Sequence, residues 1–304
     1  MWKKIAFYAL PEGRPARAHS HAQLPTALVL SGKVRIFFAA RNLQQHSSVD
    51  FVDLSLDGER VSFSAYSEQP VLTPGGIGTF DEHGVFPASV VKHNKKYFMY
   101  YIGWNQGVEP PLFYATIGLA VSEDGKHFVK HSVAPIMARS AHDPCLVTSP
   151  HVYIDRGVWR MTYVSGTAWT RKTDGTLQSH YHIKYAESEN GIDWRREGKV
   201  AIDFGRGETN IARSWVVKLA DGTYRMWFSF VSAEIGKYRI GYAESSDGYS
   251  WQRNDELAGI DVDDGQARDM ICYPCLFEYC DNRYMVYNGD SFGKNGFGVA
   301  IWAD

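Results

Sequence analysis

The stretch YRIGYAESSDGYSW, residues 238–251, recurs in variant form along the chain and therefore decides the fold. Residues 182–194 read HIKYAESENGIDW, and residues 117–128 read IGLAVSEDGKHF. An Asp-Gly or Asn-Gly pair between alternating apolar runs favours a type I′ β-hairpin, in which both central residues need a positive φ. We expect such hairpins at Asp57-Gly58, Asp124-Gly125, Asn190-Gly191 and Asp247-Gly248.

A second series of segments lies between these turns, and each segment reads as an apolar strand, a polar turn and an alternating aromatic strand. The segments are LPTALVLSGKVRIFFAA (24–40), FPASVVKHNKKYFMYYIG (86–103), SPHVYIDRGVWRMTYVSG (149–166), RSWVVKLADGTYRMWFSF (213–230) and YPCLFEYCDNRYMVYNGD (273–290). Together with the Asp-Gly hairpins they give four strands in each period of about sixty residues. The sequence therefore predicts an all-β protein, a five-bladed β-propeller with four-stranded antiparallel blades, and we expect residues 1–304 to form a single domain.

The two ends of the chain predict how the ring closes. Residues 296–304, GFGVAIWAD, match the third strand of a blade, and no fourth strand follows them. The fourth strands elsewhere begin with an aromatic residue and a basic residue two positions later, as in Phe128-Val-Lys130, and the chain begins Met-Trp-Lys-Lys. We therefore expect the N-terminal strand to complete the last blade and remove its open edge.

Composition and charge exclude several classes of protein. The 304 residues carry a formal net charge of −2, so no general attraction to nucleic acid or to an anionic membrane is expected. The apolar run near the N-terminus is short and is interrupted by Pro11, which argues against a signal peptide, and no stretch is long enough to span a membrane. Four cysteines do not make a disulfide framework, so we expect a cytoplasmic protein with free thiols.

The sequence gives no indication of a cofactor or a metal site. Cys272 and Cys275 resemble half of a zinc site, but positions three apart on a strand point to opposite faces, so we expect their sulfurs to diverge. Histidines near the strand starts, such as His83 and His151, are expected to form hydrogen bonds rather than to bind metal.

One face of the ring is predicted to carry the function. The first strands of all blades begin near the axis on this face, and long aromatic and polar loops are expected there over residues 103–116, 165–182 and 288–296. Carboxylates precede the first strand in four blades, and like charges held close together favour a division of acid and base roles. The alternative is that these residues only cap turns. The predicted catalytic residues are Asp81, Asp143, Glu208 and Asp269.

A wider set of side chains is predicted to bind the substrate. Trp104 and Trp169 are expected to stack on sugar rings, although burial between blades would also explain them. Arginines near the pocket, Arg41 among them, suit bidentate binding of phosphate or of a sugar carboxylate. The predicted substrate-binding residues are His21, Glu82, Trp104, His142, Trp169, Arg213, Arg268, Tyr273 and Asp290.

The YAES-x-D/N-G-x-x-W hairpin and the Y/W-x-M-x-Y/F strand resemble those of the five-bladed β-propeller glycoside hydrolases, the clan of families 43, 32 and 68 and, more distantly, 117 and 130. The whole chain is similar to family-43-like proteins encoded beside surface-polysaccharide genes. The resemblance implies a general acid at Glu208, an orienting carboxylate at Asp143 and, in most members, a base in the first blade. Residues 19–25, HSHAQLP, contain no carboxylate, so Asp81, Glu82, Asp269 or His21 would have to serve as the base.

Three functions stay open at this point. The first is a glycosidase, inverting as the resemblance implies, that acts on a short carbohydrate or a nucleotide-linked sugar. The second is a phosphorylase or another glycosyl-transferring propeller. The third is a non-catalytic carbohydrate-binding propeller, which the missing carboxylate of the first blade favours.

Overall fold

The computed structural model describes residues 1–64, 66–265 and 267–303, and this part of the chain is built almost entirely of β-strands. One sheet has eight strands, and three sheets have four strands each. The eight-stranded sheet contains β2 (Ser20–Leu30), β3 (Lys33–Arg41), β4 (Ser47–Asp57), β5 (Arg60–Ser64), β6 (Gly84–His93), β7 (Lys96–Gln106), β8 (Phe113–Ser122) and β9 (Val129–Lys130). A single parallel pair, Ser47 with Gly84, joins its two halves, because β4 meets β6 only there.

The other three sheets are antiparallel throughout. One contains β10 (Leu146–Asp155), β11 (Val158–Arg171), β12 (Leu177–Ser188) and β13 (Val200–Ile202). The next contains β14 (Ile211–Lys218), β15 (Tyr224–Val231), β16 (Tyr238–Ser245) and β17 (Gln252–Arg253). The last contains β18 (Cys272–Tyr279), β19 (Asn282–Asn288), β20 (Gly296–Trp302) and β1 (Trp2–Ala9). The helical segments are η1 (Ala16–Ala18), η2 (Asp255–Ala258) and α1 (Asp290–Gly293).

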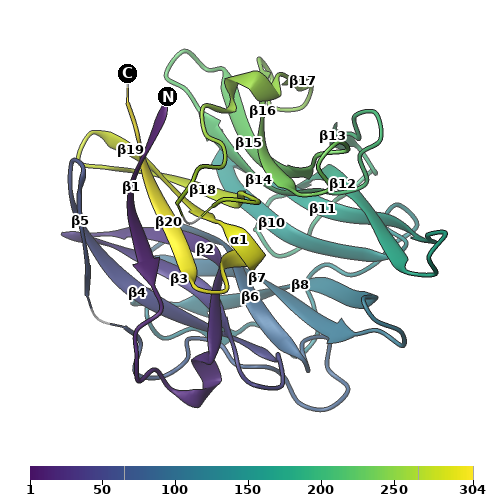
Figure 1. Cartoon of the computed structure of the whole chain (residues 1–304), viewed down its shortest axis with the longest axis horizontal. Coiled ribbons are helices and arrows are strands. Elements are labelled where there is room, and N and C mark those ends of the chain that lie inside the picture. The colour runs from purple at the N-terminus through teal and green to yellow at the C-terminus, as the bar shows by residue number, and fades with distance from the viewer. Residues whose placement is uncertain (65, 266, 304) are drawn as a thin grey trace.

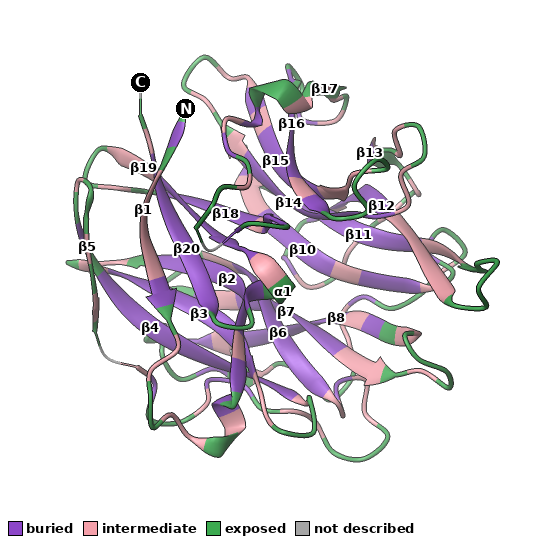
Figure 2. Cartoon of the chain, in the orientation of Figure 1, coloured by how far each residue is buried: buried purple, intermediate pink, exposed green. Residues whose placement is uncertain are grey.

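The sheets surround a common centre (Figure 1). β2 packs against β6, β6 against β10, β10 against β14, β14 against β18, and β18 again against β2, so these strands form a closed ring. This arrangement is a β-propeller, as the repeats predicted. Figure 2 shows that the strands are largely buried and that the turns between them carry most of the exposed residues. No helix in the described ranges is long and apolar enough to cross a membrane.

Glycines in the third strands let aromatic rings of the second strands lie flat against the neighbouring backbone. The pairs are Tyr101 with Gly118, Phe228 with Gly241 and Tyr287 with Gly298. A Cβ atom on any of these glycines would lie 2.2–2.6 Å from the ring, which no real side chain tolerates. The glycines of the repeated sequence are therefore required by packing as well as by turns.

The N-terminal strand closes the ring as predicted. β1 pairs antiparallel with β20, with Trp2 opposite Trp302, and the rings of these two residues meet edge-on at 5.1 Å. Trp2 also packs edge-on against Trp227 of the neighbouring sheet at 5.9 Å. The N-terminal ammonium donates a hydrogen bond to the carbonyl of Ala303, so the two ends of the chain lie together.

Two local predictions are wrong. At the Asp-Gly and Asn-Gly turns only the glycine has a positive φ, so the turns are not of type I′. In the turn after β8, Ser122 Oγ accepts the N–H of Gly125, and Asp124 Oδ1 accepts the N–H groups of Lys126 and His127. Side-chain acceptors thus replace the second positive φ, and the same pattern recurs at Ser188 and Ser245.

Two of the three expected long loops, 103–116 and 165–182, are largely strand, whereas 288–296 connects β19 to β20 without strand between them. β11 and β12 continue past the sheet as a paired hairpin, from Trp169 opposite Ser179 to Arg171 opposite Leu177. β7 and β8 also extend, ending with Gln106 opposite Phe113. Alternating residues in these segments allow the ladder to continue, so rigid hairpins replace the expected loops at this end of the molecule.

A bulge interrupts every strand of the central ring. In β18 it comprises Tyr273 and Pro274, and it shifts the register between Cys272 and Cys275. Both cysteines are fully buried, and Arg213 lies close enough to act on the pKa of both thiols. We expected the two sulfurs to diverge because residues three apart on a regular strand point to opposite faces. The bulge between Cys272 and Cys275 breaks this alternation, so the argument does not apply here. All four cysteines are free thiols.

Candidate functional site

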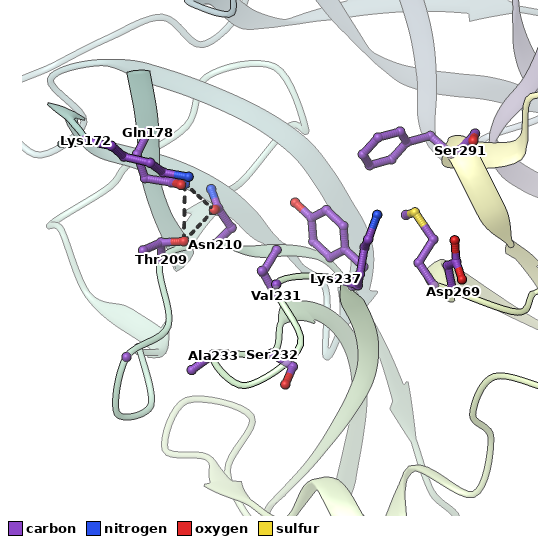
Figure 3. Close-up of a pocket in the computed structure, with 15 residues that line it drawn as sticks. Lys172, Gln178, Thr209, Asn210, Val231, Ser232, Ala233, Lys237, Asp269 and Ser291 are labelled. Carbon is purple, nitrogen blue, oxygen red and sulfur yellow. Dashed lines mark hydrogen bonds between the residues drawn. The ribbon is translucent and has the colours of Figure 1, made fainter. Parts of the chain in front are cut away.

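A cavity of about 570 Å³ opens between three segments of the propeller (Figure 3). One wall comes from the turn after β11 and from the start of β12, with Lys172 and Gln178. The floor and the opposite wall come from residues 207–210, from the hairpin of β15 and β16, and from residues beside α1. The cavity therefore lies at the end of the propeller where the extended hairpin stands.

A network of amide and hydroxyl groups fixes one wall. Gln178 Nε2 donates to Asn210 Oδ1 at 2.9 Å, and Thr209 Oγ1 donates to the same oxygen at 2.7 Å (Figure 3). Asn210 is buried, and its Nδ2 group donates to the hydroxyl and the carbonyl of Ser179. These bonds hold the polar wall in one arrangement before any ligand binds.

Two aromatic rings, Tyr238 and Phe292, line the cavity on the side of α1, and the predicted binding residue Tyr273 does not line it but packs against both rings. Phe292 stacks on Tyr273 with 6.2 Å between ring centroids, and Tyr238 lies 6.0 Å from Phe292. Ser291 and Phe292 both adopt the left-handed conformation, with φ of 53° and 58°, which is strained for residues other than glycine. Phe292 is 38% exposed, so this backbone presents an apolar ring to the cavity.

Asp269 is the carboxylate in the wall of this cavity, and its side chain is exposed. Asp290 holds the backbone beneath it: its Oδ1 accepts the N–H groups of Asp269 at 2.8 Å and Met270 at 3.0 Å, and its Oδ2 accepts that of Arg268 at 3.0 Å. Burial alone would raise the pKa of Asp290, but these N–H donors lower it below its ordinary value. Asp290 and Arg268 also line a smaller adjacent cavity of about 240 Å³.

The other three predicted catalytic carboxylates each form an ion pair with a basic residue near the last strand of the same sheet. The pairs are Asp81 with Lys130 at 2.6 Å, Asp143 with Arg196 at 2.9 Å and Glu208 with Arg253 at 2.6 Å. These bases are the ones that follow the aromatic residue in the repeated fourth-strand pattern. In the described part of the chain none of the three carboxylates lines the larger cavity, and their catalytic roles stay predictions.

Further contacts enclose these carboxylates. The hydroxyl of Tyr101 donates to Asp81 at 3.3 Å, and the hydroxyl of Tyr163 donates to Asp143 at 3.1 Å. Asp143 is completely buried, and Lys184 lies 3.7 Å from it as a second cation. Each ion pair ties the segment before a first strand to the outer edge of the same sheet, which is a structural task.

The last sheet repeats this ion pair with a different carboxylate. Lys4 on β1 binds Asp263 at 2.8 Å, and its ammonium lies over the ring of Tyr287 at 5.8 Å. The first unit has the opposite polarity, because Arg17 precedes β2 and binds Asp50 on β4 at 3.2 Å. In the last sheet Asp269 is therefore left outside the ion pair.

Arg213 does not project into the cavity. Only 1% of it is exposed, and its Nη2 group donates to the carbonyl of Pro25 at 3.1 Å and to Thr26 Oγ1 at 2.9 Å. It thus bridges from β14 to β2 inside the ring. Burial lowers its pKa.

The remaining predicted binding residues are spread over the first three units. Trp104 donates to Ser47 Oγ at 3.0 Å, and Trp169 meets Phe113 edge-on at 5.8 Å. Glu82 accepts the N–H of Gly78, His142 is exposed, and Ser20 Oγ lies 2.8 Å from His21 Nδ1. Across the described residues none of these side chains lines the larger cavity.

Sequence reasoning missed most of the residues that line this cavity. The missed residues include Lys172, Gln178, Thr209, Lys237, Tyr238 and Phe292. The segments 165–182 and 288–296 were predicted to lie on the functional face, and they supply Lys172, Gln178 and Phe292. The left-handed backbone begins at Ser291 and Phe292, two residues and one residue before the glycine, Gly293, at which a sequence pattern would predict it.

No family model matches the sequence. The uncharacterized protein Rv1502 of Mycobacterium tuberculosis strain H37Rv is 38% identical over 305 residues, which cover 99% of this chain and 98% of that protein. A 1,2-beta-oligomannan phosphorylase of Thermoanaerobacter sp. strain X514 is 24% identical over 143 residues, 46% of each chain.

Solved structures share the fold. A glycoside hydrolase superposes with a TM-score of 0.73 at 16% identity, covering 99% of this chain and 91% of that chain. A protein of the GH130 family, described as mannoside phosphorylases that include hydrolases of β-1,2 mannosidic linkages, superposes with a TM-score of 0.68 at 16% identity, covering 99% and 94%. The chain thus belongs to the family of the Mycobacterium tuberculosis protein Rv1502, and its fold is that of the glycoside hydrolase-like β-propellers.

Proposed function

We propose that the protein is a carbohydrate-active enzyme that binds a short glycan in the larger cavity and cleaves a glycosidic bond there, with Asp269 as a reacting carboxylate. The observation that carries this proposal is the cavity itself. It combines a rigid polar wall, an exposed aromatic ring and one exposed carboxylate, and its volume suits a small ligand. The apolar face of Phe292 suits the C–H face of a sugar, while Gln178 and Asn210 suit its hydroxyls.

The architecture proposed with this function is a single five-bladed domain over residues 1–304. Its support is the closed ring of β2, β6, β10, β14 and β18, together with the single pair that joins the halves of the eight-stranded sheet. A cytoplasmic location is part of the proposal, and the four free thiols support it.

Asp269 is the preferred base because it borders the cavity, whereas Asp81 is buried against Lys130. Glu208 stays the proposed general acid and Asp143 the proposed orienting carboxylate, as the family resemblance implies. Gly207 and Thr209, on either side of Glu208, line the cavity, so this acid stands close to its edge. For Glu208 to donate a proton, its two bonds to Arg253 have to be exchanged for contacts with substrate.

The test is product analysis with β-1,2-mannooligosaccharides as the first substrates, since related propellers are described as acting on β-1,2-mannosides. Hydrolysis releases free mannose without phosphate. Asp269→Asn should then lower the rate by about 10²–10⁴, whereas Glu189→Gln, an exposed carboxylate at the opposite hairpin, should not. An Asp269→Asn variant with the wild-type rate would remove Asp269 from the reaction.

Two other outcomes have their own support. Phosphate-dependent formation of mannose 1-phosphate would make the protein a phosphorylase, which the partial similarity to the oligomannan phosphorylase favours. Binding without any cleavage would make it a carbohydrate-binding propeller. The ion pairs of Asp81, Asp143 and Glu208 favour this third function, because they occupy carboxylates that a hydrolase of this fold would use.

A further inference from the structure

The larger cavity contains more positive than negative charge, although the whole chain has a net charge of −2. Lys172 and Lys237 both line it, and Asp269 is the carboxylate in its wall. Figure 3 shows Lys172 beside Gln178 on one side of the cavity, and Lys237 and Asp269 on the other. Within the described ranges neither lysine forms an ion pair.

These lysines differ from those that pack against the sheets. Lys33, Lys130 and Lys218 each bind a buried carboxylate at 2.5–2.6 Å. The fold thus supplies a counter-charge where a lysine is structural. Among the described residues, Lys172 and Lys237 form no ion pair with a buried carboxylate, so their ammonium groups are available to a ligand.

Two arginines lie behind the aromatic wall and add to the same field. Arg41 donates from Nη2 to Gln23 Oε1 at 2.6 Å, and Arg213 donates to groups of β2 and also lies beside the thiol of Cys275. Each has one buried N–H group without an acceptor, Nε of Arg41 and Nη1 of Arg213, and neither forms an ion pair in the residues described. Tyr273 lies between these arginines and Phe292, on which it stacks. Burial raises the pKa of Tyr273 well above its ordinary value, and the charge of Arg41 offsets part of this rise. Charge inside an apolar wall is weakly screened and extends into a neighbouring cleft.

We infer that the carbohydrate bound in this cavity carries a negative charge, either a carboxylate, as in a uronic acid, or a phosphate ester. Lys172 and Lys237 bind the anionic group from opposite walls, and the buried arginines strengthen the attraction. Phe292 and the amide wall bind the rest of the sugar. This inference rests on the proposed carbohydrate function and narrows its substrate class.

Calorimetric titration of the full-length protein with four probes tests the inference: glucose, glucuronate, glucose 6-phosphate and inorganic phosphate. Glucuronate or glucose 6-phosphate should bind about tenfold more tightly than glucose at low salt, and the advantage should shrink as salt is added. Whichever charged sugar binds more tightly identifies the anionic group.

Lys172→Gln and Lys237→Gln should each remove most of this advantage, so that the charged sugars bind these variants about as tightly as glucose does. Lys126→Gln, at an exposed hairpin away from the cavity, is the matched control and should change nothing. Glucose that binds as tightly as the charged sugars overturns the anion inference and leaves the carbohydrate proposal standing. Inorganic phosphate that binds as tightly as glucose 6-phosphate, again through the lysines, contradicts the carbohydrate proposal instead. Absence of binding by all four probes overturns the inference.

Discussion

The carboxylates that precede the first strands fall into two groups that look alike in sequence. Asp81, Asp143 and Glu208 are enclosed by ion pairs with bases at the outer edge of their own sheets. Asp269 occupies the corresponding place in the last sheet, but it is exposed and lines the cavity. The difference arises because Asp263 takes the base of the last sheet, Lys4, and leaves Asp269 free. In the last sheet, Asp269 is therefore available to a ligand because Asp263 performs the structural task.

The largest expected effect is on stability and comes from Asp143. Asp143→Ala leaves Arg196 and Lys184 without their buried partner, and such a loss typically destabilises by about 3–5 kcal/mol. Denaturant unfolding should show this, whereas Asp269→Ala should unfold like the wild type because its side chain is exposed. Wild-type stability of Asp143→Ala combined with lost activity would instead assign Asp143 to catalysis.

Glu208 and Arg253 should show a somewhat smaller effect, because Arg253 is partly exposed. Glu208→Gln breaks a bidentate pair, and we expect a loss of about 1–3 kcal/mol in the free energy of unfolding. If the glutamate is only structural, Arg253→Met changes stability and activity in the same proportion as Glu208→Gln. A rate loss of about 10²–10⁴ in Glu208→Gln alone, at unchanged stability, would support its role as general acid.

Much of the fold was predictable from the sequence because its repeats are local. The hairpin pattern and the strand alternation each involve residues that are close together in the sequence. Trp2 and Lys4 match the start of the other fourth strands closely enough to predict the closure. The candidate site was not predictable to the same extent. The residues near Asp81 and Asp269 in the sequence do not indicate which of the two has a basic partner. Lys130 lies 49 residues from Asp81, and Lys4, the base of the last sheet, comes from the other end of the chain.

The backbone at the site is a further reason for the missed residues. Ser291 and Phe292 are left-handed although neither is glycine, and sequence patterns favour this conformation only at the next residue, Gly293. The turns after β8 and β12 show the same limit on a smaller scale. Their serines and their Asp or Asn side chains accept backbone N–H groups, so a turn that reads as type I′ adopts a different geometry.

A smaller effect is expected at Lys4. Its ion pair with Asp263 is partly exposed, so Lys4→Met should destabilise by about 0.5–1 kcal/mol. Thermal unfolding of Lys4→Met, with Lys126→Met as an exposed control, measures this. Weaker binding at the cavity in Lys4→Met would contradict the division of tasks, because it would connect the cavity to the structural ion pair of Lys4 and Asp263. Binding that is unaffected while stability falls fits the division of tasks between Asp263 and Asp269.

The smallest expected effect is a pH dependence of stability that comes from His21. Burial, and then the charges of Arg41 and Lys294, lower the pKa of His21 to about 4 from its ordinary value of 6.5. The folded state therefore binds fewer protons than the unfolded chain between these values, so stability is present above pH 6.5 and declines as the pH falls toward 4. His21→Asn should flatten this part of the stability curve, measured by urea unfolding at a series of pH values.

An anionic ligand beside the arginines would offset the two cations and raise the pKa of His21, so an NMR titration of this ring with and without glucose 6-phosphate links the pH dependence to the ligand. An unchanged His21 titration under saturating ligand would place the anionic group away from Arg41 and confine the binding charge to Lys172 and Lys237.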